Sequence, residues 1–542
     1  MTSGGTPVER LIAAAEPTEP RPMGELLDRL ATAGLLGGGG AARAAVAARP
    51  VRGIAEDSRA AGGGRLFVAV RGFHVDGHDF VAGAEASGAA AAIVEREVPG
   101  VAMPQVVVTD ARRALAVAAG WWYRDPSRRL GVVGVTGTDG KTTTSFLAAA
   151  ALEASGLRAG LVGTVETRVG GVRERHEAHV TTPGAPELGA TLAAMAAAGD
   201  DVAVLETTSH ALELGRVLGI AYDAAILTNL THEHLELHGT FERYREAKAR
   251  LFGALVEGPA NPRKIVGGRP WPKVAVVNAD DPNRVWFERA AADAGARLVR
   301  YGWSADADVR ALAADEDASR LRVEFAAPSG AASVELRLAG RFNVHNALAV
   351  VALGEALGLP PADVRAGLAS VTGVPGRMER IAQGQPFSVI VDYAHSPASL
   401  EVVLGILAPV AAAGGGGLIA VFGSAGERDT AKRAVMGRIA GERCRLVVAT
   451  DEDPRGEDGA AIVAEIVRGA VSAGRSEGED VLGIPERRAA IAAAFGRARP
   501  GDVVLLAGKG HERTILRAGG AIPWDEAAVA RETLAAMGYR GP

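Results

Sequence analysis

The stretch Leu130–Phe146, LGVVGVTGTDGKTTTSF, constrains the fold more than any other part of this chain. Its first residues are apolar and predict a strand, the middle is a turn rich in glycine and threonine, and a helical apolar pattern comes next. A strand, a glycine-rich turn and a helix in this order make a phosphate site, because glycines let the backbone approach an anion and the first amides of the helix point at it. The sequence therefore predicts an α/β protein with a phosphate-binding loop.

The residues of this loop have chemically distinct roles. Lys141 supplies a positive charge, and the hydroxyl of Thr142 can hold Mg²⁺. The strict pattern G-x-x-x-x-G-K-[ST] fails by one residue, since Val135 stands where the first glycine is due. A plain turn after a buried strand is the alternative, but the Gly-Lys-Thr-Thr ending favours the phosphate site. The predicted nucleotide-binding loop consists of Gly137, Thr138, Asp139, Gly140, Lys141, Thr142 and Thr143.

Length and charge exclude several classes of protein. At 542 residues the chain is too long for one hydrophobic core, and three domains is the natural expectation. A net charge of -5 gives no basic footprint for nucleic acid. The single cysteine, Cys444, fits a reducing compartment and is expected to fill a core. The first thirty residues have neither a basic start nor a sustained apolar run, so we expect no signal peptide and a cytoplasmic protein.

One segment has the uncharged character of a membrane span. No charged side chain occurs between Val402 and Gly426, but Pro409 and the glycines at 414–417 interrupt the run. The apolar stretches on either side are each too short to cross a bilayer. We expect a helix end, a loop and a strand over Leu418–Phe422, and no membrane insertion.

A second strand places a carboxylate near the phosphate loop. The apolar run Val202–Leu205 predicts a buried strand, and Glu206 comes directly after it. Ligand groups in an open parallel sheet gather beyond the carboxyl ends of the strands. Glu206 is therefore a candidate Mg²⁺ ligand, and a solvated strand-end carboxylate is the alternative.

The segment after a third strand, Ala224–Thr228, contains a cluster of histidines and a helix with one unusual lysine. The spacing H-E-H-L-E-L-H, which includes His234, does not reproduce the zinc motif H-E-x-x-H. The next helix carries Tyr244, Lys248 and Leu251 at helical spacing, so Lys248 lies on the packed face. A lysine there must reach solvent, pair with a carboxylate or lose its charge.

The last third of the chain is predicted to form a separate α/β unit, with its boundary near Gly373–Gly376. Several of its predicted strands end in charged residues, and their recurrence at carboxyl ends favours a shared site over an ordinary charged surface. The strands and the polar residues after them are Val389–Val391 with Asp392 and His395, Leu418–Phe422 with Arg428, Leu446–Ala449 with Glu452, Asp453 and Arg455, and Val503–Leu506 with Gly508 and Glu512.

A series of motifs between about Val51 and Gly538 resembles the Mur ligase family. They occur in the family's order and approximate spacing, so the resemblance is specific. The motifs are DSR at Asp57–Arg59, LFVAVRGFHVDGHDF, GTDGKTTT, TTPG, ETTSHAL, LTNLTHEHLELHG with YREAK, FNVHN, GRMERI, VDYAHSP, GERD and GKGHE.

This resemblance implies a three-domain α/β architecture with a central P-loop ATPase and a carboxy-terminal domain similar to a dinucleotide-binding fold. After a variable segment at 1–48, the implied domains are a UDP-sugar-binding domain at 49–126, the ATPase at 127–370 and a ligase domain at 371–542. The implied activity is ATP-dependent ligation of a diamino acid to UDP-N-acetylmuramoyl-L-alanyl-D-glutamate in peptidoglycan synthesis. The family's reaction passes through an acyl phosphate. We expect a monomer.

The resemblance also implies roles for individual residues. By position, Thr142, Glu206 and His234 would bind Mg²⁺ together with Lys248, which is similar to the family's carbamylated lysine, and Lys141 would bind ATP phosphate. The nucleotide would also contact Asn343, Asn346, Arg377, Asp392 and His395. The muramoyl dipeptide would contact Ser58, Thr181, Thr182, Thr208 and Arg216. The amino acid would contact Arg428, Glu452, Asp453, Arg455, Gly508 and Glu512.

Some positions depart from the family pattern. Asp139 replaces the usual asparagine of the loop, and Thr207-Thr208 replaces Val-Ser. Glu452-Asp453-Pro454-Arg455 stands where diaminopimelate enzymes have Asp-Asn-Pro-Arg. The extra negative charge at Asp453 would repel the second carboxylate of diaminopimelate and would suit lysine or ornithine, whereas Arg455 acts in the opposite direction. The amino acid therefore stays open among the three, with a basic diamino acid favoured.

Two other functions compete with this one. A folylpolyglutamate-synthase-like ligase would share the P-loop and the acyl-phosphate chemistry, but it lacks the DSR and DGHDF module, so the first 125 residues discriminate. A non-catalytic member would bind ATP to regulate a partner protein. Intact Lys141, Glu206, His234 and Lys248 argue against that alternative.

Overall fold

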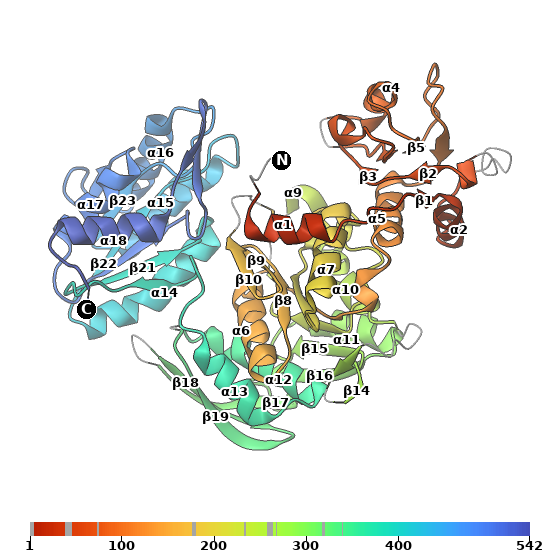
Figure 1. Ribbon diagram of the computed structural model, residues 1–542. Helices are drawn as coiled ribbons and strands as arrows, with labels where there is room; N and C mark the ends of the chain where they lie inside the picture. The colour runs from red at the N-terminus through yellow and green to blue at the C-terminus, as the bar shows by residue number, and fades with distance from the viewer. Residues whose placement is uncertain are drawn as a thin grey trace.

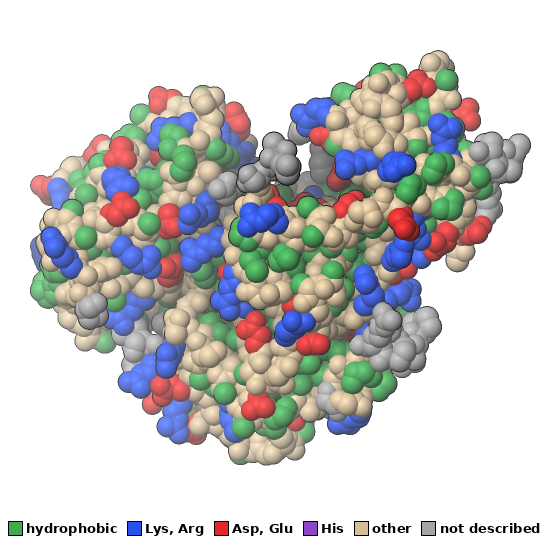
Figure 2. All heavy atoms as spheres, viewed as in Figure 1, with side chains coloured by type: hydrophobic (Ala, Val, Ile, Leu, Met, Phe, Trp, Pro, Cys, Tyr) green, Lys and Arg blue, Asp and Glu red, His purple; other side chains and the backbone are tan. Residues whose placement is uncertain are grey.

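The computed structural model describes residues 5–37, 46–72, 75–175, 180–231, 235–256, 264–266, 268–316, 320–338 and 340–541. Its helices and strands gather into three groups along the chain, each built around its own sheet (Figure 1). The mixed α/β class that the sequence predicts is confirmed. With all atoms drawn, the surface is hollowed between the amino-terminal and carboxy-terminal groups (Figure 2).

The amino-terminal group contains a parallel four-stranded sheet in the order β3-β4-β5-β6. Helix α1 lies apart from it, against α7 (Ala185–Ala198) and β10 (Val172–Arg175) of the central group, where the amide of Val8 donates to Glu174 over 3.2 Å. The elements are α1 (Pro7–Ala14), β1 (Arg21–Pro22), α2 (Gly24–Thr32), β2 (Pro50–Val51), β3 (Ile54–Ala55), η1 (Ser58–Ala60), β4 (Leu66–Val68), η2 (Gly77–Phe80), α4 (Val81–Ala86), β5 (Ala91–Val94), β6 (Gln105–Val107), α5 (Ala111–Trp122) and η3 (Pro126–Arg128).

The central group is built on an eleven-stranded sheet, counted within the described residues, in the order β10-β9-β8-β11-β7-β12-β15-β16-β17-β18-β19. The strands from β8 to β17 in this sheet order (β8, β11, β7, β12, β15, β16 and β17) run parallel. Antiparallel strands extend the sheet at both edges. The strand that leads into the phosphate loop therefore lies near the middle of the sheet.

The strands of the central group are β7 (Gly131–Thr136), β8 (Ala159–Val162), β9 (Glu166–Val169), β10 (Val172–Arg175), β11 (Val202–Glu206), β12 (Ala224–Leu227), β13 (Ile265–Val266), β14 (Arg269–Pro270), β15 (Val274–Asn278), β16 (Arg297–Gly302), β17 (Val309–Glu316), β18 (Leu321–Ala327) and β19 (Gly330–Leu336). Its helices are α6 (Lys141–Ala154), α7 (Ala185–Ala198), α8 (Ser209–Glu213), α9 (Leu235–His238), α10 (Phe241–Gly253), α11 (Arg284–Asp293), α12 (Asn343–Leu357) and α13 (Pro361–Ser370).

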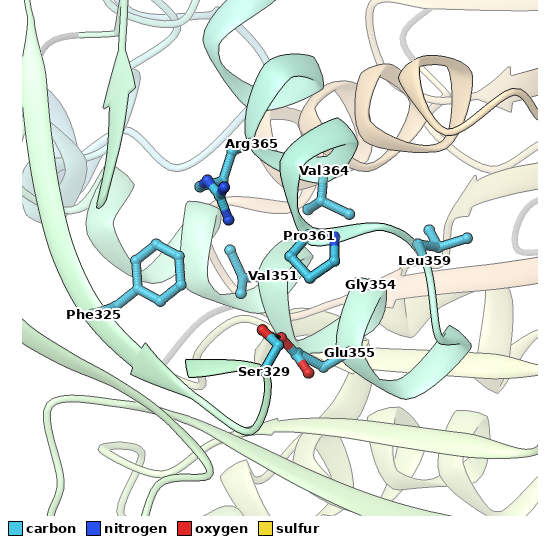
Figure 3. Close-up of a pocket in the computed structure, with 9 residues that line it drawn as sticks. All are labelled: Phe325, Ser329, Val351, Gly354, Glu355, Leu359, Pro361, Val364 and Arg365. Atoms are coloured by element: carbon cyan, nitrogen blue, oxygen red, sulfur yellow. Dashed lines mark hydrogen bonds between the residues drawn. The ribbon is translucent and has the colours of Figure 1, made fainter. Parts of the chain in front are cut away.

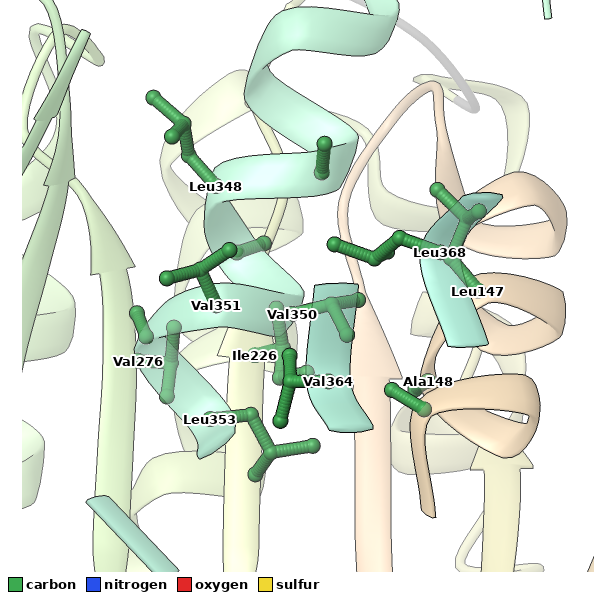
Figure 4. Packing of buried hydrophobic residues seen from close by; sticks show 14 of the residues in the cluster. Leu147, Ala148, Ile226, Val276, Leu348, Val350, Val351, Leu353, Val364 and Leu368 are labelled. Atoms are coloured by element: carbon green, nitrogen blue, oxygen red, sulfur yellow. The ribbon is translucent and has the colours of Figure 1, made fainter. Parts of the chain in front are cut away.

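Both faces of the central sheet are buried, which explains why its strands are apolar without alternation. In β12, Ile226 points to the core formed with α6, α12 and α13, and Leu227 points to the core beneath α7 and α10. Figure 4 shows Ile226 and Val276 packed below α12, with Leu147 of α6 close by. A fully buried side chain such as Leu147 contributes about 1.5–3 kcal/mol, so this double packing fixes the strand ends that carry the candidate site.

The carboxy-terminal group has a six-stranded sheet in the order β20-β21-β25-β22-β23-β24, parallel from β21 to β24. Its parallel strands therefore end at one common edge. The elements are β20 (Glu379–Ile381), β21 (Ser388–Asp392), α14 (Pro397–Ala413), β22 (Leu418–Phe422), α15 (Ala431–Arg443), β23 (Leu446–Ala449), α16 (Gly459–Ser472), β24 (Val481–Gly483), α17 (Arg487–Arg497), β25 (Val503–Ala507), β26 (Thr514–Arg517), β27 (Gly520–Pro523) and α18 (Glu526–Ala536).

The uncharged segment Val402–Gly426 forms the end of α14, a glycine-rich turn and β22, as the sequence predicts. Leu404 and Phe422 are buried in the core of the carboxy-terminal group. Among the residues that the structure describes, no helix has both the length and the apolar character that crossing a bilayer requires.

A small cavity lies between the β18–β19 hairpin and the helices α12 and α13 (Figure 3). Phe325, Glu355 and Val364 are among the side chains that line it. Glu355 lies twelve residues after the first residue of α12, which is about 18 Å along a helix, so the cavity is remote from the phosphate loop. The cavity lies at an edge of the sheet and is distinct from the candidate site.

Candidate active site

The phosphate loop has the conformation that its glycines predict. Gly137 comes after β7 with φ of 150° and Gly140 precedes α6 with φ of 80°, and α6 begins at Lys141. A side chain at Gly137 would meet the hydroxyl of Thr228 at 1.8 Å, so only glycine fits there. The amide of Asp139 donates to the side-chain oxygen of Asn229 over 2.9 Å. The loop is therefore anchored to the end of the neighbouring strand, β12.

Two lysine side chains meet at this loop. Lys141 donates to the carbonyls of Gly137 and Thr138 over 3.0 and 2.7 Å, and Lys248 donates to the same Gly137 carbonyl over 2.7 Å. Lys248 lies on the buried face of α10 with only 1% of its surface exposed, as the helical spacing predicts. Its Nζ lies 4.6 Å from the centre of the Tyr244 ring. The buried lysine therefore hydrogen bonds inside the loop instead of reaching solvent.

Glu206 lies beside the loop, where the end of a central strand was expected to place it. Strand β11 pairs with β7, and Glu206 is opposite Val135. Its carboxylate is fully buried and accepts the hydroxyl of Thr142 over 3.0 Å. Thr164, between β8 and β9, donates to the same carboxylate from its hydroxyl over 2.8 Å and from its amide over 2.9 Å. A carboxylate and two hydroxyls thus converge next to the first turn of α6.

The threonines predicted to bind the dipeptide surround Glu206. Thr182 donates to the Glu206 carbonyl over 2.7 Å and lies 3.2 Å from the hydroxyl of Thr208. The hydroxyls of Thr181 and Thr164 lie 3.0 Å apart, within hydrogen-bond distance. Arg216 donates to the Thr182 carbonyl over 3.0 Å. Four of the predicted substrate residues therefore form one connected group at the phosphate loop.

The amino-terminal group approaches these threonines through its DSR loop. Ser58 begins the short helix η1, which Asp57 caps. A side chain on Gly184, in the TTPG loop, would lie 3.1 Å from Glu56 Oε1. The five predicted dipeptide residues thus come from three segments: the DSR loop, the TTPG loop and the chain after β11.

Two carboxyl groups and an arginine share this contact between the loops. Burial raises the pKa of Glu56, and the charge of Arg216 opposes that shift. Burial also raises the pKa of Glu187, and the negative charge of Glu56 adds to the effect. The pKa of Arg216 is lowered by burial. The carboxylates of Glu56 and Glu187 therefore repel each other at this contact, and the packing of the two segments favours the protonated forms.

The two asparagines predicted at the nucleotide are buried at the start of α12. Asn346 donates to the side-chain oxygen of Asn343 over 2.9 Å and accepts the hydroxyl of Thr144 over 3.1 Å. Thr144 lies in the first turn of α6, so Asn346 contacts the helix that begins at the phosphate loop. Both asparagines thus lie on the loop side of α12.

In the carboxy-terminal group, the predicted nucleotide residues gather around Tyr393. Arg377 lies over its ring at 4.8 Å, and the ring of His395 lies 4.6 Å away. Asp392 accepts the amides of Met378 and Ala394 over 2.8 and 2.9 Å. Arg377, Asp392 and His395 therefore form one cluster at the end of β21.

Burial raises the pKa of Asp392, the charge of Arg377 opposes that shift, and the charge of Asp139 adds to it. Asp139 belongs to the phosphate loop of the central group. The cluster around Tyr393 thus lies within electrostatic reach of the loop.

The predicted amino-acid residues meet at the same edge of the sheet. Lys509 is fully buried and donates to Asp453 over 2.8 Å and to Glu512 over 2.5 Å. Glu512 accepts the hydroxyl of Tyr393 over 3.3 Å. Glu452 Oε2 is buried and has no hydrogen-bond partner among the described residues. Lys509 therefore offsets the extra negative charge that Asp453 brings to the Glu452–Arg455 motif.

Four predicted residues, of which Ser58 is one, are not joined to these groups by a described side-chain contact. Arg428 is exposed, and Arg455 is held through its backbone amide, which donates to the Leu516 carbonyl over 2.9 Å. His234 lies outside the described residues. The roles predicted for them stay predictions.

Sequence reasoning missed two residues at the centre of these contacts. Thr164 belongs to no motif, and only the fold brings it to Glu206. Lys509 stands inside the GKGHE motif, but its burial against Asp453 depends on a residue 56 positions away.

Comparison with known proteins finds the same family along most of the chain. A model described as "Mur ligase family, catalytic domain" matches residues 50–123, "Mur ligase middle domain" matches 135–354 and "Mur ligase, glutamate ligase domain" matches 376–510. The first match covers the DSR and DGHDF motifs, and the second covers the phosphate loop from Val135 onward.

Individual relatives are similar over nearly their whole length. A UDP-N-acetylmuramyl-tripeptide synthetase from Roseiflexus sp. (strain RS-1) is 50% identical over 91% of this chain and 96% of its own. A UDP-N-acetylmuramoyl-L-alanyl-D-glutamate–2,6-diaminopimelate ligase from Geobacillus kaustophilus is 41% identical, over 90% of this chain and 94% of its own. A solved structure of a ligase with that same description is 31% identical, with a TM-score of 0.63 over 91% of this chain and 96% of that one.

Proposed function

Because the chain belongs to the Mur ligase family, we propose that it joins a diamino acid to UDP-N-acetylmuramoyl-L-alanyl-D-glutamate in an ATP-dependent step of peptidoglycan synthesis. The observation that carries the proposal is the connected group of Thr142, Glu206, Thr182 and Arg216, which links the phosphate loop to the predicted dipeptide loops. ATP and dipeptide would therefore meet at Glu206.

The reaction needs two steps, because a carboxylate is a poor acyl donor. The D-glutamate side-chain carboxylate attacks the γ-phosphorus of ATP and releases ADP, and an acyl phosphate results. The amine of the diamino acid then attacks the acyl carbon, loses a proton and displaces inorganic phosphate. Each step brings negative groups together, so Lys141 and the first amides of α6 contribute mainly by offsetting repulsion and aligning the reactants.

The donor set at Glu206 fits Mg²⁺. The Thr142 hydroxyl and the Glu206 carboxylate are 3.0 Å apart and buried, and Mg²⁺ prefers such oxygen ligands. These two residues would hold the ion, and His234 is the third candidate from the family. When bound, the ion neutralises charge on the phosphates.

Lys248 is proposed to carry a carbamate. Its neutral amine would add CO₂ and release one proton, which turns a buried cation into a carboxylate near the loop. The carbamate keeps one N–H, and that N–H can still donate to the Gly137 carbonyl that Lys248 contacts over 2.7 Å. The observed bond of this buried lysine to a carbonyl is thus compatible with the modification.

The nucleotide is proposed to lie between the central and carboxy-terminal groups. Asn343 and Asn346 would contact adenine, Asp392 the ribose, and Arg377 and His395 the phosphates. The effect of Asp139 on the pKa of Asp392 supports an approach of the two groups at this point. The domains are proposed to have the boundaries 49–126, 127–370 and 371–542, and their closure would complete the site.

The incoming amino acid is proposed to be lysine or ornithine. Asp453 pairs with Lys509, so the carboxylate available for a side-chain ammonium is Glu452, whose Oε2 is buried and unpartnered among the described residues. A second carboxylate, as in diaminopimelate, would be repelled by Glu452, whose charge has no described partner to offset it, unless Arg455 turned toward it.

Both alternatives have less support. The match of an amino-terminal family model to residues 50–123 disfavours a folylpolyglutamate-synthase-like enzyme, which lacks that module. A non-catalytic protein would have no need for a buried carboxylate bonded to Thr142. Since two of the proposed substrates, ATP and the UDP-linked dipeptide, are nucleotides, we propose a cytoplasmic protein, and we propose that it is a monomer.

The proposal is tested by ADP release from the purified protein with ATP, Mg²⁺ and UDP-N-acetylmuramoyl-L-alanyl-D-glutamate. Diaminopimelate, lysine and ornithine are supplied in separate reactions. We expect ADP release that requires both the dipeptide and a diamino acid, with lysine or ornithine preferred. A protein that turned over none of the three, while still binding ATP, would support the non-catalytic alternative.

A further inference from the structure

Two loops at the carboxyl edge of the last sheet present the proposed amino-acid residues. One comes after β23 and carries Glu452 and Asp453, and the other comes after β25 and carries Gly508 to Glu512. Strand β22 lies between β23 and β25, so the two loops are not neighbours through the sheet. Their relative position must be set by something other than strand pairing.

The first loop crosses the end of β22 to reach the second. A side chain at Gly423 would lie 2.3 Å from the Thr450 carbonyl and 2.7 Å from the Glu452 amide. The absence of a side chain there lets the backbone at 450–452 pass close over the strand. Glu452 thereby comes next to Gly508, where an added side chain would lie 2.9 Å from Glu452 Oε2.

Arg487, the first residue of α17, lies beneath both loops. Its side chain is 1% exposed. The guanidinium donates to the carbonyl of Asp451 over 3.0 Å and to the carbonyl of Ala507 over 2.7 Å. Each carbonyl belongs to the residue just before a proposed amino-acid contact, Glu452 in one loop and Gly508 in the other. The guanidinium therefore connects the backbones of the two loops, in addition to the side-chain pair between Lys509 and Asp453.

Glu526 holds this guanidinium in place. Its carboxylate accepts from Arg487 Nη2 over 2.7 Å and from Nε over 3.0 Å, and the indole of Trp524 donates to it over 2.6 Å. The pair is fully buried, so removing either charge would leave the other uncompensated. The fork geometry of arginine allows carbonyl and carboxylate contacts at once, which the single ammonium of lysine does not reproduce.

We propose that Arg487 is a positioning residue for amino-acid recognition: by bridging the carbonyls of Asp451 and Ala507 it fixes the spacing between Glu452 and the Gly508–Glu512 segment. This inference rests on the proposed function for the identity of the ligand, whereas the coupling between the loops is a property of the fold alone. Arg487 acts through these loops and does not touch the reacting atoms.

The chain offers a matched control at the opposite edge of the same sheet. Arg445 precedes β23 and pairs over 2.5 Å with Asp502, which precedes β25. It thus connects the amino-terminal ends of the same two strands. Arg445→Lys makes the same chemical change without involving the two loops that carry Glu452 and Gly508.

The experiment compares Arg487→Lys with Arg445→Lys in the full-length protein by hydrogen exchange and steady-state kinetics. Three amides report on the loops: Gly426 donates to the Asp453 carbonyl, Arg455 to the Leu516 carbonyl, and Leu516 to the Asp453 carboxylate. We expect faster exchange at these amides in Arg487→Lys only. We also expect its KM for the diamino acid to rise about tenfold or more, because small misplacements of binding groups are costly, with the KM values for ATP and dipeptide within about twofold.

Unchanged exchange in Arg487→Lys, or equal rises in all three KM values, would overturn the inference. If Arg487→Lys does not fold, Trp524→Phe replaces it, since it removes the indole hydrogen bond to Glu526 but keeps both buried charges, and it should cause a smaller effect in the same direction. Exchange is measured without substrates, so it tests the coupling between the loops independently of activity. Failure of the wild-type protein to turn over any diamino acid would count against the proposed function, and the exchange result would still decide whether Arg487 couples the loops.

Discussion

Lys141 and Lys248 donate to the same carbonyl oxygen, that of Gly137, over 3.0 and 2.7 Å. The two lysines come from different helices, α6 and α10, and Lys248 is buried. Two ammonium groups at one oxygen repel each other, and a carbamate on Lys248 would turn that repulsion into attraction. This shared acceptor is therefore where the proposed modification has its clearest physical advantage.

The first prediction concerns Lys248→Ala. The variant should fold and lose at least about 100-fold in turnover, a loss typical of removing one stabilising group. Acetate or propionate should restore part of the rate by supplying a carboxylate in the space left. Arg250→Ala is the control, because Arg250 lies on the exposed side of the same helix and pairs with Glu213. Full activity of Lys248→Ala in ADP release would refute the assignment.

The second prediction concerns Glu206→Gln. The amide keeps the size of the carboxylate, and its single oxygen can still accept the hydroxyls of Thr142 and Thr164, so the fold should persist. The lost charge should lower turnover by about two to three orders of magnitude and raise the Mg²⁺ concentration needed for half-maximal rate. A Mg²⁺ titration of ADP release checks both effects. An unchanged Mg²⁺ requirement would remove Glu206 from the proposed metal site.

The third prediction separates Glu452 from Asp453. Glu452→Gln should raise the KM for lysine or ornithine about tenfold or more, an amount typical of losing a charged hydrogen bond, with little change in the KM for ATP. Asp453→Asn should act mainly on stability, because it removes one of the two carboxylates that pair with the buried Lys509. We expect a loss of about 1–3 kcal/mol in unfolding free energy. The reverse pattern, with Asp453 controlling the KM, would contradict the roles given to these residues.

The fourth prediction is a pH dependence at Glu187. Glu187 is an exposed residue of α7, and partial desolvation at this contact, followed by the charge of Glu56, raises its pKa above the ordinary value of 4.5. The folded state then holds this proton more tightly than the unfolded state, so stability falls as pH rises from 4.5 through the folded-state pKa. In Glu187→Gln this contribution is absent, and the unfolding midpoint should fall less between pH 4.5 and 7. Calorimetry at several pH values checks the slope, and parallel curves for both proteins would contradict the prediction.

Local patterns were enough to predict which residues lie around the phosphate loop. The strand, glycines and Lys141 lie within one short stretch, and Glu206 comes directly after an apolar run that is typical of a central strand. Lys248 was identified by its spacing with Tyr244 and Leu251, because helix geometry decides which residues share a face. In each case the information lies within about one element of the residue concerned.

Contacts between distant segments could not be predicted in the same way. Thr164 reaches Glu206 only because β8 pairs with β11, and Arg487 connects loops that start on non-adjacent strands. In the sequence alone, the extra negative charge of Asp453 has no assigned partner, because its pairing with the buried Lys509 depends on the fold. Where the site depends on which segments meet, composition and spacing carry too little information.

The fate of one carboxylate oxygen of the dipeptide tests the proposed acyl-phosphate step directly. UDP-N-acetylmuramoyl-L-alanyl-D-glutamate labelled with ¹⁸O in the D-glutamate side-chain carboxylate is turned over with ATP and ornithine or lysine, and the inorganic phosphate is analysed by mass spectrometry. Because the carboxylate oxygen attacks the γ-phosphorus and leaves with phosphate, we predict one labelled oxygen in each phosphate released. Unlabelled phosphate formed together with the amide product would contradict an acyl phosphate at Glu206 and the phosphate loop.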